Sequence, residues 1–286
     1  MPAEIIIPNQ ERLTQAVAAM RADGVESLHI LADFDRTLTG GLINGQETPS
    51  IISVLYDENY LTPDYGAKAR ALAEKYRNIE TDPAVSPADK KQAMAEWWNL
   101  HFDLLINSHL KINDIKQACA SRRIGLRDGV AEFIKTLNDH HIPLVVMSAT
   151  GLGEESIKIF LAREKCLLDN VYIAANAFNW DDQGQALSVR QPIITSYNKD
   201  ETVLDNFPFF DQIKNRRNVL LLGDSIGDLG MITGFDYKQL VSIGFLNARV
   251  EANLPQFKAN FDIIITDDGP LDYVNQLLQS IIKNPA

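Results

Sequence analysis

The sequence predicts an α/β protein with a doubly wound parallel sheet and an all-helical segment inserted after the first central strand. Short apolar runs that suit buried strands alternate with helical stretches over most of the chain, which is typical of parallel sheets with helices on both faces. Residues 42–127 interrupt this alternation, because they contain no β-branched run of strand length. Several of the apolar runs end directly in Asp, Ser or Gly.

The first expected elements are a helix and a central strand. Asn9 suits the N-cap of a helix that runs to about Asp23, and Gly24 suits its end. The apolar run that begins at Leu28 then suits a buried strand, and this strand ends in Asp33-Phe34-Asp35. We expect the hydroxyl of Thr37 to fix the turn that follows.

The interrupting segment is predicted to form helices only. Ser86-Pro87 supplies an N-cap and a first-turn proline for its longest helix. The expected helices cover residues 49–59, 64–76, 87–107 and 113–120. We therefore expect a helical cap domain at 42–127 and an α/β core domain at 1–41 and 128–286.

The alternation of helix and strand returns after Asp128-Gly129. Strands are expected where the chain is apolar, at 142–147, 171–175, 219–222, 239–245 and 262–265. Helices are expected before and between them, to His140, at 153–165, and after each of the last two strands. A hairpin is expected at 178–189 around Asp182-Gln183-Gly184.

Composition restricts the classes of partner. The formal net charge of −11 argues against nucleic acid, whose binding relies on many Lys and Arg contacts to phosphates. A small anionic ligand would need a local cation, and a bound divalent metal is the simplest candidate. The three isoleucines at 5–7 are too short for a signal-peptide core, and no apolar run approaches the length of a membrane span. We therefore expect a cytoplasmic protein with no membrane partner.

Polar residues gather where the apolar strands end. Carboxyl ends of parallel strands meet at one edge of a sheet, so groups distant in sequence can converge there. These groups are Asp33, Asp35, Ser148, Asp224 and Asp228, with Lys199 in a connecting region. Carboxylates, a lysine, a hydroxyl and Gly-rich loops together suit Mg²⁺-assisted phosphoryl transfer. Taken singly, Asp228 also suits a helix cap and Lys199 a solvated surface position.

The same motifs carry a family resemblance. Asp-Phe-Asp-Arg-Thr at 33–37, the strand-terminal Ser148, Lys199 and Gly-Asp-Ser-x-Gly-Asp at 223–228 occur in the order found in the haloacid dehalogenase (HAD) superfamily of phosphatases, which the chain resembles. It is most similar to the class III cytosolic (pyrimidine-type) 5′-nucleotidases, over nearly its whole length. This closer resemblance includes segments 94–98, 198–199, 221–229 and 243–247.

The resemblance implies a HAD core with a helical cap and a Mg²⁺-dependent hydrolase acting on nucleoside 5′-monophosphates. It implies that Asp33 is the nucleophile that forms an aspartyl-phosphate, and that Asp35 is the general acid and base. It also implies that Mg²⁺ is held by Asp33, the main-chain carbonyl of Asp35, Asp224 and Asp228. Phosphate oxygens would be bound by Ser148, the amide of Ala149 and Lys199.

The resemblance further implies that the cap selects the nucleobase. A cap Glu that matches Glu96 contacts the base in the family, and Trp97 and His101 lie within about a turn and a half of it on the expected helix. Neighbouring helical positions point about 100° apart, so Trp97 and Trp98 are not both expected to face the pocket. The base is left open between pyrimidine, purine and 7-methylguanine, as are phosphate transfer to nucleosides and the oligomeric state.

The sequence departs from the family pattern at three positions. Thr150 stands where many relatives have glycine, and its side chain could crowd the phosphate loop. Arg36 replaces an apolar residue, as a surface group or an extra cation near the mouth of the site. His101 falls near a position where relatives carry a small polar residue, which affects base preference more than reaction type.

Two other functions fit the same residues. The first keeps the chemistry and changes the substrate to phosphoserine or another small phosphomonoester. The second is a phospho-accepting or nucleotide-sensing module without turnover. This module has no reason to place an acid at Asp35 or to carry an insert of this size, which favours the enzyme.

Overall fold

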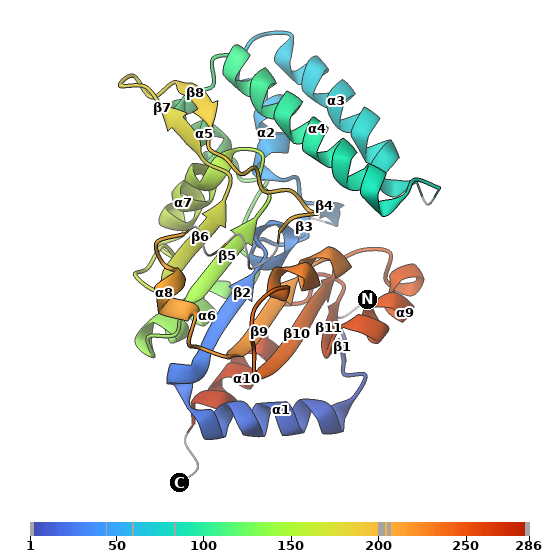
Figure 1. The fold of residues 1–286 in the computed structure, drawn as a ribbon, viewed down its shortest axis with the longest axis vertical. Helices are drawn as coiled ribbons and strands as arrows, with labels where there is room; N and C mark the ends of the chain where they lie inside the picture. Colours follow the sequence, from blue (N-terminus) through green and yellow to red (C-terminus); the bar gives the residue numbers. More distant parts are fainter. Residues whose placement is uncertain are drawn as a thin grey trace.

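A seven-stranded sheet forms the centre of the molecule (Figure 1). The computed structural model describes residues 3–43, 45–58, 60–82, 84–199, 204 and 207–283. The strands follow the order β1-β11-β10-β9-β2-β5-β6, and all pairs are parallel except β1 with β11. Their bounds are Ile5–Ile6 (β1), Leu28–Ala32 (β2), Leu144–Ser148 (β5), Val171–Ala175 (β6), Asn218–Gly223 (β9), Gln239–Leu246 (β10) and Ile263–Thr266 (β11).

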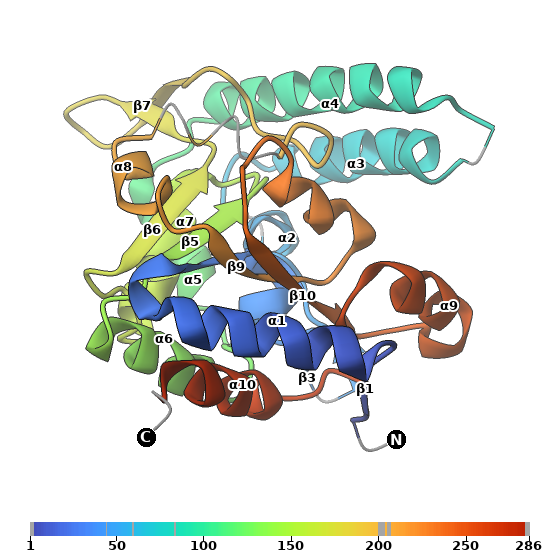
Figure 2. The same ribbon diagram turned by 60° about the horizontal axis from the view of Figure 1, so that its bottom comes forward.

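Helices cover both faces of this sheet, which confirms the doubly wound prediction. Alternate residues of β2 point to opposite faces, as the pleat requires. Ile30 packs with α1 (Gln10–Asp23), α6 (Val130–Asp139), α7 (Gly153–Arg163) and α10 (Asp272–Ile282). Figure 2 shows α1 and α10 side by side on that face.

Other helical segments cover the opposite face. Leu31 of β2 packs in a second apolar cluster with Ile213 of α8 (Phe210–Ile213) and Met231 of a 3₁₀ helix at Ile226–Ile232. Phe257 of α9 (Val250–Asn260) contacts Ile264 in a third cluster. Because the central strands are apolar on both faces, the sheet has few solvent-facing positions, as expected of buried parallel strands.

Local sequence signals account for the helix ends that were predicted. Asn9 caps α1 by accepting a hydrogen bond from the Arg12 amide at 3.0 Å, and Gly24 ends the helix with φ of 79°. Ser86 caps α4 (Pro87–Asn107) by accepting a hydrogen bond from the Asp89 amide at 3.2 Å. Both helices therefore begin and end where the sequence predicted.

Residues 42–127 form mostly helices: α2 (Ile51–Asp57), α3 (Tyr65–Thr81), α4 (Pro87–Asn107) and α5 (Ile112–Ala120). The helices α3 and α4 lie side by side beyond the carboxyl ends of the central strands (Figure 1). Buried residues of α2 and α5 belong to the same apolar cluster as the sheet. The domain boundaries at 42 and 127 stay a prediction.

The prediction that this segment is all-helical was wrong at its start. The two-residue strands β3 (Leu42–Ile43) and β4 (Gln46–Glu47) pair there as a short antiparallel hairpin. Strands this short leave no periodic pattern to detect. The helix predicted at 49–59 begins at Ile51, and its predicted last residue, Asn59, lies outside the described residues.

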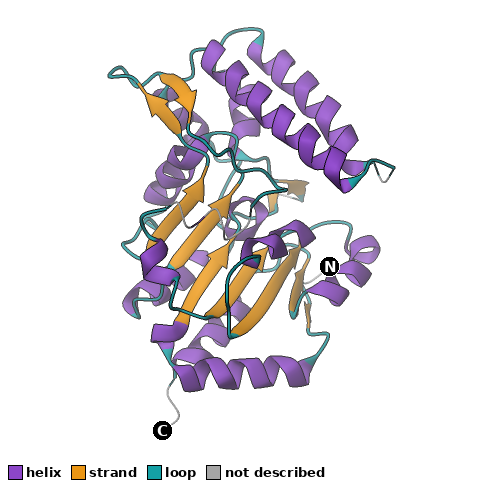
Figure 3. Cartoon of the chain, viewed as in Figure 1, coloured by secondary structure: helices purple, strands orange, loops and turns teal. Residues whose placement is uncertain are grey.

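A second hairpin lies beside the helical segment (Figure 3). Its strands, β7 (Phe178–Trp180) and β8 (Ala186–Val189), confirm the prediction at 178–189. The amide of Ile112 donates to the Gly184 carbonyl, and that of Ala186 donates to the Leu110 carbonyl, both at 2.9 Å. Among the helices that the structure describes, none is long and apolar enough to cross a membrane.

Candidate active site

A cavity of about 330 Å³ lies at the carboxyl edge of the sheet, between the strand ends and the inserted helices. The core contributes the ends of β2, β5 and β9 and the loops that follow them. The described residues that line it are Asp33, Asp35, Arg36, Thr39, Thr48, Pro49, Ser50, Ser53, Arg77, Ser148, Ala149, Ser196, Lys199, Asp224, Ser225, Gly227 and Asp228. Every residue predicted for catalysis, metal binding or phosphate binding is in this set.

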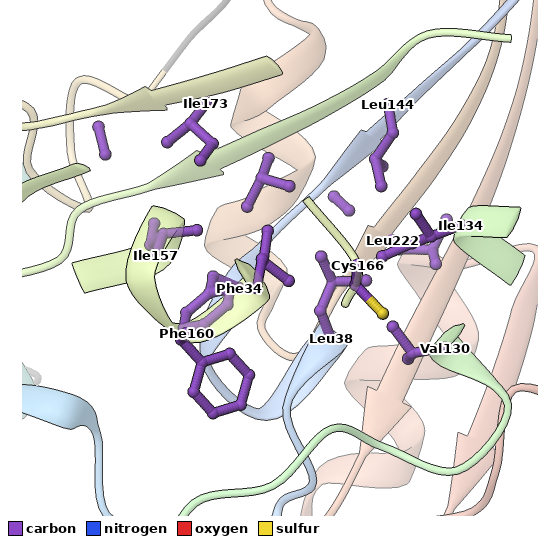
Figure 4. Close-up of a cluster of buried hydrophobic side chains, with 14 of the residues drawn as sticks. Phe34, Leu38, Val130, Ile134, Leu144, Ile157, Phe160, Cys166, Ile173 and Leu222 are labelled. Atoms are coloured by element: carbon purple, nitrogen blue, oxygen red, sulfur yellow. The ribbon is translucent and has the colours of Figure 1, made fainter. Parts of the chain in front are cut away.

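The chain direction after β2 places both of the first two aspartates at the cavity. The Asp33 amide donates to the Leu222 carbonyl of β9 at 2.9 Å, which continues the sheet pairing into the site. Phe34, between the aspartates, points into the core and packs edge-on against Phe160 of α7, with ring centroids 5.5 Å apart (Figure 4). This packing holds the turn on its core side, and Asp33 and Asp35 line the cavity.

A tight turn closes directly after Asp35. Its backbone runs through Arg36 with φ of 60° and ψ of 8°, and the Thr39 amide donates to the Phe34 carbonyl at 3.0 Å. The Thr39 hydroxyl accepts a hydrogen bond from the Arg36 amide at 2.8 Å. The predicted role of Thr37 was therefore wrong, because its buried hydroxyl has no partner among the described residues.

The loop after β9 brings in two more carboxylates. One oxygen of Asp228 accepts hydrogen bonds from the amides of Asp224 (3.1 Å) and Ser225 (3.0 Å) and from the Ser225 hydroxyl (2.9 Å). Asp228 thus both caps the short helix that starts at Ile226 and shapes the loop that carries Asp224. Gly223 permits this approach, since a Cβ there would lie 2.4 Å from the Asp228 Cβ.

Lys199 lies in the same buried group of charges and not on the surface. Its ammonium donates to Asp33 and, at 2.9 Å, to the second oxygen of Asp228. The exposed fraction of the lysine residue is 6%. A lysine buried this deeply requires paired carboxylates, and these two supply them.

Burial controls the protonation of the site. It raises the pKa of Asp33 well above its usual range, and Asp228 and Asp224 add to the rise, although Lys199 opposes it. Burial likewise raises the pKa of Asp35 to about 6 and that of Asp224 to about 7. Burial alone would lower the pKa of Lys199, but the carboxylates of Asp33 and Asp228 outweigh it and raise that pKa. Groups with such displaced pKa values concentrate at functional sites.

The acidic cluster suits a hard divalent cation. Asp33, Asp224 and Asp228 each place one carboxylate oxygen within 4.8 Å of the others. Carboxylate oxygens are the ligands that Mg²⁺ and similar cations prefer. The crowded charges that raise the pKa values here are also those that a cation would neutralise. The residues present therefore fit a metal site.

The strand end of β5 is placed as predicted, and the Thr150 departure is accommodated. Ser148 and Ala149 line the cavity together with the aspartates. The Thr150 side chain is buried away from the cavity, where its hydroxyl lies 3.5 Å from that of Ser156. Thr150 is not among the residues with positive φ, so the loop follows a backbone that threonine adopts without strain.

The three residues predicted to bind the base do not come together at the cavity. Glu96 is exposed on α4 and lies 4.0 Å from Lys75. Trp97 stacks on Tyr76, with ring centroids 6.0 Å apart. His101 is buried, with its Nε2 3.1 Å from the Gly151 carbonyl oxygen, and burial lowers its pKa to about 4. None of the three is among the described residues that line the cavity.

The cavity also contains residues that the sequence did not single out. Ser50 and Ser53 of the α2 region and Arg77 of α3 face it from the inserted segment. The predicted helix ended at Tyr76, one residue before Arg77, whereas α3 continues to Thr81. Arg36, one of the three departures, lines the mouth with its side chain 45% exposed. Arg36 and Arg77, from different parts of the chain, therefore line the cavity as cations in addition to Lys199.

The chain shares the fold of the haloacid dehalogenase (HAD) hydrolases. A crystal structure of phosphoserine phosphatase with bound substrate, 20% identical, shares this fold with a TM-score of 0.51 over 87% of this chain and 96% of that one. The match is far closer to cytosolic 5′-nucleotidase IIIB bound to cytidine. That structure is 31% identical, with a TM-score of 0.88 over 97% of this chain and 93% of that one.

Sequence comparison leads to the same family. The chain belongs to the pyrimidine 5′-nucleotidase (UMPH-1) family, whose sequence profile matches residues 36–282. It is 32% identical to the 7-methylguanosine phosphate-specific 5′-nucleotidase of Rattus norvegicus, over 99% of this chain and 94% of the relative. It is 34% identical to the Drosophila melanogaster protein of that description, over 91% of this chain and 82% of the relative.

Proposed function

We propose that this protein is a Mg²⁺-dependent 5′-nucleotidase that hydrolyses nucleoside 5′-monophosphates to nucleoside and phosphate through an aspartyl-phosphate. The observation that carries the proposal is the convergence of Asp33, Asp35, Asp224 and Lys199 on one cavity at the sheet edge. Family membership supports the same reaction, since the relatives are described as 5′-nucleotidases. The cavity of about 330 Å³ suits a small substrate, and Lys199 in its lining supplies a positive charge for an anionic one.

The first step uses Asp33 as the nucleophile. One of its carboxylate oxygens forms a bond to phosphorus while the bond from phosphorus to the ribose O5′ breaks in line. Asp33, the Asp35 main-chain carbonyl, Asp224 and Asp228 would hold Mg²⁺, which when bound neutralises charge on the phosphoryl oxygens. Ser148, the Ala149 amide and Lys199 would bind those oxygens, where charge stabilisation is usually the largest catalytic contribution.

Asp35 moves the protons in both steps. Its protonated carboxyl gives its proton to the leaving O5′ and becomes a carboxylate. That carboxylate then takes a proton from the water that attacks phosphorus, and the bond between phosphorus and the Asp33 oxygen breaks. The pKa of about 6 that burial gives Asp35 keeps both protonation states accessible near neutral pH.

A substrate panel tests this function. With Mg²⁺ present, we expect kcat/KM for nucleoside 5′-monophosphates to exceed that for phosphoserine by at least about 100-fold, because binding energy from the nucleoside contributes to the transition state. Phosphate release from pyrimidine, purine and 7-methylguanosine monophosphates at equal concentration measures the preference. Equal rates on phosphoserine would favour the small-phosphomonoester function instead, and no turnover of any ester would favour a phospho-accepting module.

We also propose that the base is bound by Glu96, Trp97 and His101, as the sequence predicts. Glu96 lies on α4 and outside the lining of the cavity, so it can meet a base only if the substrate extends beyond that lining. A variant of His101 could also disturb the phosphate-binding residues, because its ring contacts the backbone of Gly151, close in sequence to Ser148 and Ala149. A base contact is therefore tested best at Glu96.

We expect Glu96→Ala to lower kcat/KM for nucleoside monophosphates by roughly tenfold, the effect of losing one hydrogen bond to a charged group. Hydrolysis of p-nitrophenyl phosphate, which has no base, should stay within twofold. Glu74→Ala is the matched control, since Glu74 is also an exposed glutamate, on the neighbouring helix α3. Equal losses on both substrates would remove Glu96 from base recognition.

A further inference from the structure

A buried arginine stands where the chain returns from the inserted helices to the core. The side chain of Arg127 is only 1% exposed. Its guanidinium donates to the carbonyls of Thr37 (2.8 Å), Gly269 (2.9 Å) and Arg36, and to the side-chain oxygen of Asn247 (2.9 Å). Two of these acceptors belong to the turn that follows Asp35. An arginine fork is suited to hold several acceptors in fixed directions, and a lysine is not.

The charge of Arg127 is balanced next to that turn. Asp268 pairs with the guanidinium at 2.8 Å, and the plane lies over the Phe245 ring, 4.3 Å from its centroid. The same carboxylate also binds the backbone at the start of the insert. Its oxygen that pairs with Arg127 accepts from the Gly41 amide (2.6 Å), and its second oxygen accepts from the Leu42 amide (2.8 Å). Asp268 and Phe245 therefore hold the guanidinium in place independently of its contacts with the turn.

The turn needs such support because its backbone is strained. Arg36 has φ of 60°, a left-handed conformation that is unfavourable for a non-glycine residue. A residue stays in that region only when its surroundings over-determine it. The Arg36 carbonyl accepts from Arg127 and, at 2.9 Å, from the Asn247 side-chain amide. Two side chains from two elements therefore hold one strained peptide.

Asp35 lies between two parts of the chain that are held by hydrogen bonds. On its N-terminal side the chain is fixed by the sheet bond of Asp33 to Leu222, and on its C-terminal side by the contacts to the carbonyls of Arg36 and Thr37. We propose that Arg127 and Asn247 are positioning residues for the reaction, which hold the carboxyl of Asp35 in line with the leaving group. This inference rests on the proposed function, because it assumes that Asp35 protonates that group.

A purely structural role is the alternative, and the network also ties the two linkers of the insert. The Gly40 amide donates to the Gly125 carbonyl, and the Arg127 amide donates to the Leu38 carbonyl, both at 3.0 Å. Loosening these linkers would lower kcat/KM for all substrates to a similar extent. Misplacing Asp35 would slow hydrolysis of the aspartyl-phosphate for every substrate, but it would slow the phosphorylation step, which kcat/KM reports, only for esters whose leaving group needs a proton. The leaving group therefore separates the two roles.

The experiment compares kcat/KM for a nucleoside monophosphate and for p-nitrophenyl phosphate, whose nitrophenolate leaves without a proton. We expect Arg127→Lys and Asn247→Ala to lower the first by at least about tenfold and the second by less than threefold, within the range that general acid catalysis supplies. Arg123→Lys is the matched control, because Arg123 precedes Arg127 in the same linker and pairs at the surface with Asp57. Thermal unfolding confirms that each variant is folded, and Asn247→Ala alone decides if Arg127→Lys does not fold.

Asp35→Asn identifies which proposal fails. For Asp35→Asn, which stops after one turnover, the ratio is taken from the single-turnover phosphorylation rates of the two substrates. If Asp35→Asn changes this ratio but the Arg127 and Asn247 variants do not change theirs, the positioning role is overturned and the proposed function stands. If Asp35→Asn leaves the ratio unchanged, its role as the acid is wrong and the positioning role falls with it. A changed ratio in all three variants, with the Arg123 control unchanged, supports both.

Discussion

We expect Asp33→Asn to remove essentially all turnover of nucleoside monophosphates, by about 10⁴-fold or more, as for the loss of other catalytic nucleophiles. The amide cannot attack phosphorus, while the surrounding contacts change little because Asn has the same shape. No phosphorylated enzyme should form, and mass spectrometry of the acid-quenched protein checks this directly. Asp169→Asn, an exposed change of the same kind between α7 and β6, should keep the wild-type rate.

The neighbouring variant should behave differently. Asp35→Asn keeps the nucleophile but has no proton to give and no base for the attacking water, so p-nitrophenyl phosphate should phosphorylate it once and then stop. A burst of one nitrophenolate per enzyme, with the phosphoryl group trapped on Asp33, is the expected result. Turnover in Asp33→Asn at even a tenth of the wild-type rate would exclude the covalent mechanism.

The elements that sequence predicted best are those with strong local signals. The central strands are apolar on both faces, and N-cap residues such as Asn9 and Ser86 mark the start of a helix. The site followed from the same logic, since Asp33, Ser148 and Asp224 stand at strand ends that a parallel sheet must bring to one edge. Lys199 could be placed only by resemblance, because nothing local distinguishes it from a surface lysine.

What sequence missed has no local signal. The edge strand β1 and the hairpin of β3 and β4 are two residues per strand, so they show no period. The network of Arg127 joins side chains to backbone carbonyls that are up to 142 residues apart, and backbone acceptors are the same in every sequence. The sequence led us to expect Thr37 as the turn residue, whereas the hydroxyl that accepts from the Arg36 amide, at 2.8 Å, is that of Thr39.

The base site shows the limit of reasoning from one helix. Glu96, Trp97 and His101 are close in sequence, yet successive helical positions point about 100° apart, so they reach different surroundings. Glu96 faces outward toward Lys75, Trp97 stacks on Tyr76, and His101 turns inward to the Gly151 backbone. The cavity is instead approached from α3 by Arg77, which lies one residue beyond the predicted helix.

The same charges that build the site should make it a source of instability when no metal is bound. Burial and the Asp228 carboxylate raise the pKa of Asp224 to about 7 from an ordinary value of 3.8. The folded state therefore binds this proton more tightly than the unfolded chain does. The stability that protonated Asp224 contributes is present at low pH and is lost as the pH rises from about 4 to about 7.

We therefore expect metal-free Asp224→Asn to unfold at a higher temperature than the wild type near pH 8, with the difference closing toward pH 4. Mg²⁺ should reverse the order. At 100 times its dissociation constant it should stabilise the wild type by about 2.7 kcal/mol, or roughly 5 °C for a chain of this size, and leave Asp224→Asn nearly unchanged. Thermal unfolding followed by circular dichroism in chelator and in Mg²⁺ measures both effects.

Asp182→Asn, in the exposed turn of the β7–β8 hairpin, is the control and should match the wild type throughout. An equal Mg²⁺ shift in Asp224→Asn would mean that the ion binds elsewhere, because a site that depends on this carboxylate cannot survive its loss.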